Sequence, residues 1–382
     1  MGRKNAFVCL LLMPFALIYR MVTDVRNMLF DLNILPSEKF PVPVICIGNI
    51  SVGGTGKTPF TEYLICLLKE QYRVATLSRG YKRKTKGFVL AEEQCTADDV
   101  GDESCQIKRK FPGIIVAADA NRCRAIRRLL ALPEEKRPDV ILLDDAMQHR
   151  YVQPSLTIML TDYNSLYYDD CLLPAGNLRE SAYATSRADI VVVTKCRKDL
   201  KPIDLRLMEK NMSLMANQHL YFSTISYHKM EPLFPSKKLK SYSLPEINKN
   251  EDIILITGVA NPQPLIETVK SHCNNVHVCK FPDHHAFEQS DIQYIDDEFR
   301  KVASPSCKII CTEKDAMRLK HLTFLPEKWK SCLYYLPISV KFLPGRGDDF
   351  DAIILKHIIS TVSILQKKEC QEQKSQHSEN LD

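Results

Sequence analysis

The chain has 382 residues, of which 45% are hydrophobic and 26% are charged, as in soluble globular proteins rather than disordered or fibrous ones. This length exceeds that of a typical single domain, so we expect two domains or one large one. The net charge of +6 is too small to indicate an obligate nucleic-acid binder, although it suits an anionic substrate or a membrane surface. The 14 cysteines include no Cys-x-x-Cys pair, which argues against a disulfide scaffold and favours reduced thiols.

The first 30 residues contain a long apolar run. Residues 6–19 are almost entirely apolar, are interrupted by Pro14, and are bordered by basic residues at positions 3, 4 and 20. Fourteen residues are too few for a comfortable membrane span, and no small-x-small cleavage site follows, as a signal peptide would require. The apolar pattern continues at helical spacing with Met21, Val22, Val25 and Met28. We therefore predict an amphipathic helix over residues 1–30 that lies in the membrane interface; a helix packed on the protein's own core is the alternative.

Apolar runs rich in β-branched residues then alternate with helical patterns, which is typical of an α/β protein with a largely parallel sheet. The expected strands lie at 42–47, 73–77, 114–117, 140–143, 156–160, 190–193 and 219–222, and the expected helices at 59–70, 121–130 and 203–215. A second α/β stretch has expected strands at 253–257, 276–279, 308–311 and 333–336 and a last helix at 350–365. We therefore predict a larger domain at 31–225, an inter-domain linker at 226–250, a smaller α/β domain at 251–365 and a polar disordered tail at 366–382.

The segment 51–58, with the sequence SVGGTGKT, lies between the first expected strand and the first helix of the larger domain. This is the context of a phosphate-binding loop, in which backbone N–H groups and the N-terminus of a helix contact phosphates. Lys57 would contact the β- and γ-phosphates of a nucleoside triphosphate, and the Thr58 hydroxyl would ligate Mg²⁺. The usual pattern has Gly in place of Ser51, although Gly53 and Gly54 supply the backbone freedom that such a loop needs. A plain strand-to-helix turn is the alternative. The candidate ATP-binding residues are Ser51, Val52, Gly53, Gly54, Thr55, Gly56, Lys57 and Thr58.

The apolar strand at 140–143 ends in the adjacent carboxylates Asp144 and Asp145. Such a pair is typical of a Walker B element, because Mg²⁺ takes one or two carboxylates together with phosphates and water. A strand that runs into a solvated acidic turn is the alternative. Together with the phosphate loop, the pair predicts a P-loop NTPase-like fold for the larger domain.

Further polar clusters follow other strands. Arg79, in the basic run at 78–84, could guide a phosphate, and either Asp102 or Glu103 could accept a proton from an attacking hydroxyl. Arg179 and Glu180 follow a Pro/Gly turn and could contact the γ-phosphate and a metal. Each cluster also has a simpler interpretation as a solvated loop or a surface ion pair. In the second domain, His284 could orient or tune a carboxylate base, with a structural histidine as the alternative.

In this order the motifs resemble the tetraacyldisaccharide 4′-kinases of lipid A biosynthesis. The resemblance extends from about Phe7 to about Lys341 and is carried by GNISVGGTGKTPF, SRGYKRK, VGDE, LLDDAMQHR, LLPAGNLRE, TGVANP, FPDHHAF and TEKDA. It implies transfer of the γ-phosphate of ATP, with Mg²⁺, to the 4′-hydroxyl of a tetraacyldisaccharide 1-phosphate, which gives lipid IVA. It also implies a peripheral enzyme on the cytoplasmic face of the bacterial inner membrane. We expect no nucleic-acid partner and no obligate protein partner.

The resemblance also assigns roles to matching residues. Asp102 takes the place of the family's proposed base, and His284 takes the place of its partner. The implied catalytic residues are Asp102, His284, Lys57 and Arg179, and the implied metal ligands are Thr58, Asp144, Asp145 and Glu180. Further candidates for substrate contact or support are Glu103, Gln148, His149 and Arg79. Asn177 stands where Pro is usual, and Ala146-Met147 where Gly-Leu is usual, which affects loop shape rather than chemistry.

A P-loop ATPase or GTPase switch acting at the membrane surface is the alternative function. The deviant phosphate loop of that class has a second Lys near its start, where this chain has Val52. Steady hydrolysis without a lipid acceptor would favour the switch. Absence of both transfer and hydrolysis would favour a membrane-surface binding protein that uses nucleotide only for folding or oligomerisation.

Overall fold

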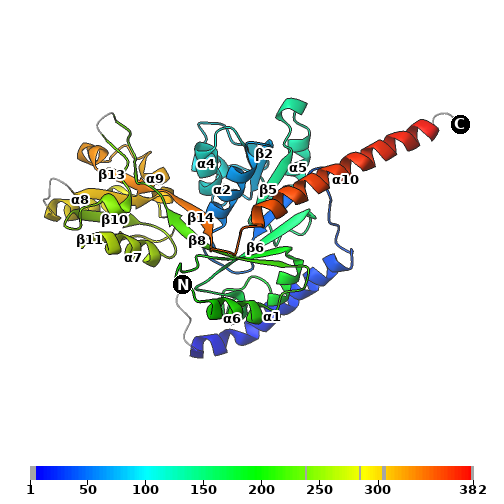
Figure 1. The fold of residues 1–382 in the computed structure, drawn as a ribbon, viewed down its shortest axis with the longest axis horizontal. Helices are drawn as coiled ribbons and strands as arrows, with labels where there is room; N and C mark the ends of the chain where they lie inside the picture. Colours follow the sequence, from blue (N-terminus) through cyan, green and yellow to red (C-terminus); the bar gives the residue numbers. More distant parts are fainter. Residues whose placement is uncertain (1–5, 237–238, 284, 303–306, 380–382) are drawn as a thin grey trace. The chain divides into compact units, whose positions relative to one another are not determined.

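The structure, a computed structural model, describes residues 6–236, 239–283, 285–302 and 307–379. The chain divides into two compact units (Figure 1). The smaller unit comprises Ser226–Ser339, and the larger consists of the chain up to Ile225 and from Val340 onward. Both units are built on mostly parallel sheets with helices, which confirms the predicted α/β fold class.

The larger unit contains a nine-stranded sheet in the order β14-β8-β7-β6-β1-β5-β2-β4-β3. Strand β1 lies at its centre and pairs in parallel with β5 and β6, while β3 pairs antiparallel with β4. Central strands of parallel sheets are buried on both faces and therefore read as continuous apolar runs, which is why β1, β5 and β7 were recognisable. The strands are β1 (Val44–Gly48), β2 (Val74–Ser78), β3 (Val89–Leu90), β4 (Ile115–Ala118), β5 (Val140–Asp144), β6 (Leu156–Asp162), β7 (Ile190–Thr194), β8 (His219–Tyr227) and β14 (Ile338–Phe342).

Helices cover both faces of this sheet. Alternate residues of β1 enter different hydrophobic clusters: Val44 and Cys46 pack on the side of α5 and α6, and Ile45 and Ile47 pack on the side of α2, α4 and α10. This alternation follows from the two-residue period of a strand. The helices of the larger unit are α1 (Ala6–Asp31), α2 (Lys57–Leu68), α3 (Ala97–Val100), α4 (Asp102–Lys110), α5 (Arg122–Leu130), α6 (Pro202–Met212) and α10 (Phe350–Glu379).

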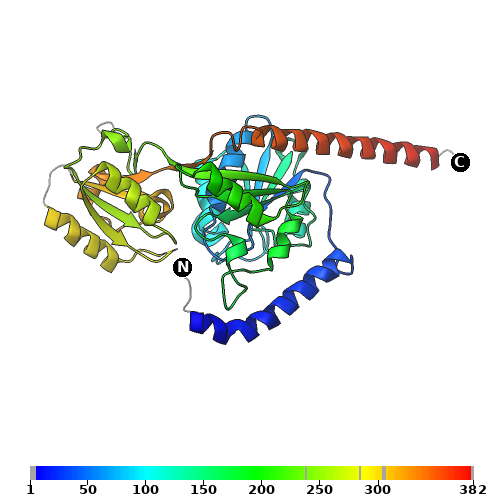
Figure 2. The same ribbon diagram turned by 60° about the horizontal axis from the view of Figure 1, so that its bottom comes forward.

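Helix α1 is mostly exposed. By length and composition, its residues from Phe7 to Asp31 are long and apolar enough to cross a membrane, and only 6% of the most apolar stretch is buried. From the sequence we expected the apolar run at 6–19 to be too short to cross a membrane. The helix is long enough because apolar residues continue past Arg20 within the same helix. Phe30 is buried at its C-terminal end and packs edge-on against Tyr151, with ring centroids 5.1 Å apart. Figure 2 shows the rest of α1 lying along the outside of the larger unit. Ala16 is buried, but large apolar side chains of this helix, among them Phe7, Leu11 and Phe15, are exposed.

Helix α10 extends to Glu379, where we expected a helix ending at residue 365 and a disordered tail beyond it. Its first half is fixed by Phe350, Ile354 and Ile358, which are fully buried against the sheet. The segment 366–379 is polar, but it is rich in Lys, Glu and Gln and contains no Gly or Pro. These residue types have high helix propensity, so the polar composition is compatible with a helix.

The smaller unit contains a five-stranded sheet in the order β11-β10-β12-β13-β9. The short strand β9 pairs antiparallel with β13 and lies inside the segment predicted as a linker, of which positions 237–238 lie outside the described residues. Met230, Leu244 and Ile247 of that segment are also buried, so much of it belongs to the core of this unit. The elements are β9 (Glu231–Pro232), β10 (Asp252–Thr257), α7 (Gln263–His272), β11 (Asn275–Lys280), α8 (Gln289–Val302), β12 (Lys308–Thr312), α9 (Glu313–Leu319) and β13 (Leu333–Leu336).

Candidate functional site

The phosphate loop joins the carboxyl end of β1 to the N-terminus of α2. Gly53 and Gly56 adopt φ angles of 118° and 84°, in the left-handed region that favours glycine. Gly56 directly precedes α2 and provides no side-chain cap, so no capping side chain competes for the first N–H groups of this helix. Lys57 and Thr58 are the first two residues of the helix, where an anion is stabilised by the helix dipole.

Ser51, the residue that departs from the usual loop pattern, lies in a backbone ladder. It forms an antiparallel bridge with Leu178, and it is 7% exposed. On either side of the bridge, the Val52 N–H donates to the Asn177 carbonyl at 2.7 Å and the Arg179 N–H donates to the Ile50 carbonyl at 2.7 Å. This pairing holds Arg179 and Glu180 next to the phosphate loop.

Asp145 contacts both of the other predicted clusters around the ATP-binding loop: Lys57 of the phosphate loop and Arg179 of the turn at 173–180. Its carboxylate lies 3.6 Å from the Lys57 ammonium and accepts a hydrogen bond from the Arg179 guanidinium at 3.2 Å. Burial opposes ionisation of Asp145, but Lys57 and Arg179 outweigh it and lower the pKa of this carboxyl below its usual value. Both cations are therefore held at one carboxylate beside the phosphate loop.

Asp144 has the opposite electrostatic environment. Its side chain is buried, and among the described residues its Oδ1 has no hydrogen-bond partner. Burial, Glu103 and Asp145 together raise the pKa of Asp144 to about 7. Such a carboxylate fits a bound divalent cation, which would satisfy its free oxygen and offset its charge. Among the described residues, no group of three or more His, Cys, Asp or Glu side chains is arranged to hold a metal ion by itself.

Asp102 and Glu103 are the first residues of α4 and are both half-buried. The preceding residue, Gly101, has φ 89°, and a Cβ there would lie 3.0 Å from the carbonyl oxygen of Tyr81. The Ser78 and Ser104 hydroxyls are 2.6 Å apart and join the end of β2 to the same helix. The turn that bears Asp102 therefore packs tightly on the basic loop after β2, and Arg79 of that loop is exposed.

Asn49 contacts the lysine of the phosphate loop, and the sequence did not single it out although it is part of the GNISVGG motif. It is fully buried, its amide donates to the Ser51 carbonyl at 2.6 Å, and its Oδ1 accepts from the Lys57 ammonium at 3.2 Å. Gln148 in turn donates to the Asn49 carbonyl at 2.9 Å. Asn49 thus orients the lysine of the phosphate loop, and Gln148 supports it.

His149 follows Gln148 and is half-buried. Burial and the nearby cations Arg122, Arg26 and Arg79 lower its pKa to about 4, so this imidazole is neutral near pH 7. Its Nε2 has no hydrogen-bond partner among the described residues. His149 therefore has an unused hydrogen-bonding atom in the interior and does not contribute a positive charge.

Glu180, predicted as a metal ligand, is 2% exposed and forms an ion pair with Arg187. Arg187 belongs to a short 3-10 helix, Ala182–Arg187, and neutralises this carboxylate from within the protein. This pairing could not be predicted from the sequence, because Arg187 lies outside the recognised motifs.

In the smaller unit, two of the recognised motifs meet at Asp315. Its carboxylate accepts from the Gly258 N–H at 2.8 Å and from the Thr312 hydroxyl at 2.7 Å, so the TGVANP and TEKDA loops are held together. His284 lies outside the described residues. Its neighbour His285 binds the Asp291 carboxylate at 2.7 Å.

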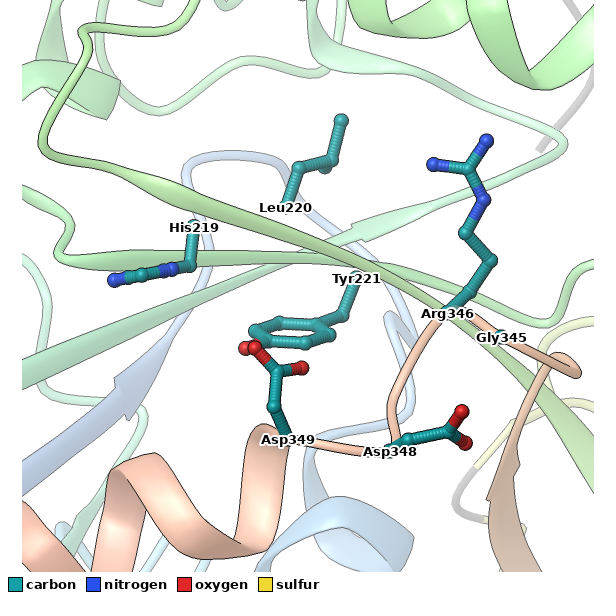
Figure 3. A pocket seen from close by; sticks show the side chains of 7 residues that line it. All are labelled: His219, Leu220, Tyr221, Gly345, Arg346, Asp348 and Asp349. Carbon is teal, nitrogen blue, oxygen red and sulfur yellow. The ribbon is translucent and has the colours of Figure 1, made fainter.

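A separate polar pocket of about 250 Å³ lies at the start of β8, next to the turn that precedes α10 (Figure 3). None of the predicted site residues lines it. Ile190 and His219 are register partners at the amino ends of the parallel strands β7 and β8, whereas the phosphate loop follows the carboxyl end of β1. The pocket is therefore at the opposite edge of the sheet from the phosphate loop. Its lining residues are His219, Leu220, Tyr221, Gly345, Arg346, Asp348 and Asp349.

Comparison with known proteins gives matches over both units. A model of the family described as LpxK, tetraacyldisaccharide-1-P 4′-kinase, matches residues 8–359. A tetraacyldisaccharide 4′-kinase of Parabacteroides distasonis is 52% identical over 348 residues, which cover 91% of this chain and 94% of that protein. One of Bacteroides thetaiotaomicron is 49% identical over 354 residues, which cover 91% and 92%. The crystal structure of LpxK from Aquifex aeolicus in complex with ATP matches with a TM-score of 0.69 and 26% identity, covering 92% of this chain and 99% of that one.

Proposed function

Because the chain belongs to the tetraacyldisaccharide-1-P 4′-kinase family, we propose that it transfers the γ-phosphate of ATP to the 4′-hydroxyl of a tetraacyldisaccharide 1-phosphate, giving lipid IVA. The observation that carries this proposal is the convergence of the phosphate loop, the Asp144–Asp145 pair and Arg179 at one edge of the sheet. These are the parts that phosphoryl transfer requires, namely a phosphate cradle, carboxylates that would hold a metal, and a cation for the transferred group.

We propose that ATP binds with its phosphates on residues 51–58. The backbone N–H groups at the start of α2 bind phosphate oxygens, and Lys57 contacts the β- and γ-phosphates. Thr58, Asp144 and Asp145 are the residues that would hold Mg²⁺, with Glu180 as a further candidate. When bound, Mg²⁺ neutralises charge that develops on the phosphates.

Arg179 is proposed to stabilise the transferred phosphoryl group. Arg179 and Lys57 share the carboxylate of Asp145 as their counterion. Bound phosphates would compete for both cations, so each would be released toward the γ-phosphate without a new cation having to be recruited. Once both cations lie at the phosphates, their charge would stabilise the negative charge that develops on the transferred group.

Asp102 is proposed to accept the proton of the 4′-hydroxyl, and His284 to tune this base. Asp102 is the first residue of α4 and stands beside Glu103. It follows Gly101, whose positive φ and close contact with the Tyr81 carbonyl favour glycine at that position. This tight turn supports a fixed orientation for the Asp102 carboxylate. Glu103 also contributes to the raised pKa of Asp144, so the start of α4 lies near the metal ligands. Further candidates for substrate contact or support are Gln148, His149 and Arg79.

We further propose that residues 31–225 serve as the kinase domain and that α1 attaches it to the cytoplasmic face of the bacterial inner membrane. Exposed apolar side chains along α1 support this attachment: Leu10 is 71% exposed and Leu17 is 59% exposed. Helix α1 also contacts the donor site, because the Tyr19 hydroxyl donates to the Arg179 carbonyl at 2.9 Å. A lipid acceptor would thus meet the protein on the side where phosphate transfer takes place.

Replacing both Leu10 and Leu17 by Glu should weaken binding to anionic phospholipid vesicles at least about tenfold, because each leucine loses roughly 1.5–3 kcal/mol of burial. The midpoint of thermal unfolding and the Kd for MgATP should not change, because neither side chain is buried. Vesicle co-sedimentation measures the effect. Ile359→Glu, at a 61% exposed position on α10, is the matched control. Undiminished vesicle binding by the double variant would contradict attachment through α1.

The proposed function is tested by measuring ADP release from MgATP with and without tetraacyldisaccharide 1-phosphate in detergent. A kinase releases ADP in proportion to the acceptor that it consumes and only slowly in its absence. Lys57→Met should abolish the acceptor-dependent release. Rapid ADP release that is independent of acceptor would instead support the ATPase switch.

A further inference from the structure

Two strand ends contact the phosphate loop: Asp145 after β5 approaches Lys57, and the end of β7 contacts the loop as well. Thr194 is the last residue of β7, and its hydroxyl donates to the Thr55 carbonyl at 2.8 Å. The ammonium of the next residue, Lys195, donates to the Gly54 carbonyl. Two consecutive carbonyls at the tip of the loop are thus bound by two consecutive residues of another strand end.

Lys195 is itself held in place by Asp162, the last residue of β6. Their charged groups lie 2.8 Å apart, and both side chains are mostly buried, with 21% and 14% of their area exposed. The other oxygen of Asp162 accepts from the Asn164 N–H at 2.8 Å, so the carboxylate has a fixed orientation. Lys195 also has φ 57°, a left-handed conformation that non-glycine residues adopt rarely and that often occurs at functional sites.

These contacts fix the orientation of the loop's peptide planes. In a planar trans peptide the C=O and the following N–H point in opposite directions. Because Thr194 binds the Thr55 carbonyl, the Gly56 N–H points away from β7, toward the side on which phosphates bind. Thr194 also lies beside Gly56, since a Cβ at Gly56 would be in ordinary van der Waals contact with its Oγ1 at 3.8 Å.

We propose that Asp162, Thr194 and Lys195 are positioning residues for ATP. Thr194 and Lys195 bind the carbonyl groups at the tip of the phosphate loop, and Asp162 holds Lys195 in place. The N–H groups of the loop are then already oriented for phosphate before the nucleotide arrives. This inference rests on the proposed binding of ATP at residues 51–58, and it adds a role for three residues outside the recognised kinase motifs. The ligand that they serve is the polyphosphate chain of the nucleotide rather than its base.

Variants of these residues should change the affinity for MgATP more than the rate of phosphoryl transfer. Lys195→Met removes the ammonium but keeps most of the aliphatic chain, so the loop loses a charge-assisted hydrogen bond. We expect the Kd for MgATP to rise about tenfold, and KM for ATP to rise by more than kcat falls, since the loop binds ground state and transition state alike. Asp162→Asn should have a similar effect, and the double variant should be little worse than either single variant because the two residues act together.

Calorimetric titration of the full chain in detergent, without lipid acceptor, tests the proposal with two probes, MgATP and inorganic tripolyphosphate. Both should bind more weakly to Lys195→Met by the same factor, because both carry the phosphate chain. Lys198→Met, at an exposed position in the same loop, is the matched control and should bind both as the parent does. If only MgATP binds more weakly, Lys195 acts on the nucleoside and the proposal is overturned.

A second pair of variants separates positioning from a purely structural role. Thr194→Ser keeps the hydroxyl and should keep the affinity for both probes, whereas Thr194→Val should weaken both about tenfold. Parent-like affinity in Thr194→Val, or an equal loss in Thr194→Ser, would overturn the proposal. Because these titrations contain no acceptor, their outcome is independent of whether the phosphate is transferred to a lipid.

Discussion

Replacing Asp102 by Asn should lower kcat by about two to four orders of magnitude while leaving the Kd for MgATP unchanged. Asparagine has nearly the shape of aspartate and can begin α4 in the same way, but its amide does not accept a proton from the acceptor hydroxyl. The loss should therefore be confined to the transfer step. Initial-rate kinetics with saturating acceptor, together with calorimetric titration of MgATP, measure the two quantities separately.

Asp98→Asn is the matched control for this prediction. Asp98 lies on α3, four residues before Asp102, and forms a surface ion pair with Lys84 at 2.6 Å. Exposed pairs of this kind contribute little, so kcat should stay within about twofold of the parent value. A parent-like kcat in Asp102→Asn would remove Asp102 from the role of base. A parallel loss of MgATP affinity would assign it to nucleotide binding instead.

The second large effect is a gain of stability accompanied by a loss of activity in Asp144→Asn. Burial, Glu103 and Asp145 raise the pKa of Asp144 to about 7, above its value of about 3.9 in an unfolded chain. The folded protein therefore binds this proton more tightly than the unfolded chain does. It follows that stability falls as the pH rises from about 4 to about 7, and the penalty stays in full at higher pH.

Asparagine does not ionise, so without metal and nucleotide the variant should unfold several degrees above the parent at pH 8. Near pH 4 both side chains are neutral and the difference should vanish. Kinase activity should be lost at all pH values, because a carboxylate that would hold Mg²⁺ is gone. Thermal unfolding followed by circular dichroism at the two pH values checks the first part, and the transfer assay checks the second.

Asp145→Asn serves as the comparison, because Lys57 and Arg179 lower the pKa of Asp145. Ionised Asp145 stabilises the folded state above the unfolded pKa of this group, so its replacement should lower the unfolding midpoint at pH 8. A lower midpoint in Asp144→Asn as well would contradict the electrostatic description of the pair.

Much of this fold could be predicted from local patterns in the sequence. The central strands of the larger unit are continuous apolar runs, and each was placed to within about two residues. The phosphate loop was recognisable because its glycines and the helix after it are contiguous in the chain. The short strand β9 was missed because its surroundings are rich in Pro and Lys, and because its pairing with β13 joins residues about 100 positions apart.

The features of the site that could not be predicted are contacts between residues that are not adjacent in the sequence. Ser51 is the simplest case: as a motif position it is a departure from pattern, but in three dimensions it pairs with Leu178 and holds Arg179 beside the loop. Glu180 was assigned to a metal, while its partner Arg187 lies in no motif. Asp162 and Lys195 are likewise ordinary strand-end residues in sequence, and only the order β7-β6-β1 places them at the phosphate loop.

The central claim is that the γ-phosphate passes from this loop to the 4′-oxygen of a lipid disaccharide. The most direct measurement is to incubate the full chain in detergent with tetraacyldisaccharide 1-phosphate and MgATP that carries ¹⁸O in its γ-phosphate. Phosphorus–proton correlation NMR of the purified lipid then locates the labelled phosphate through the ¹⁸O isotope shift of its phosphorus resonance. We predict a labelled phosphate monoester on the 4′-oxygen, formed in step with ADP. Label found only in free phosphate, or on another hydroxyl, would contradict the proposed reaction.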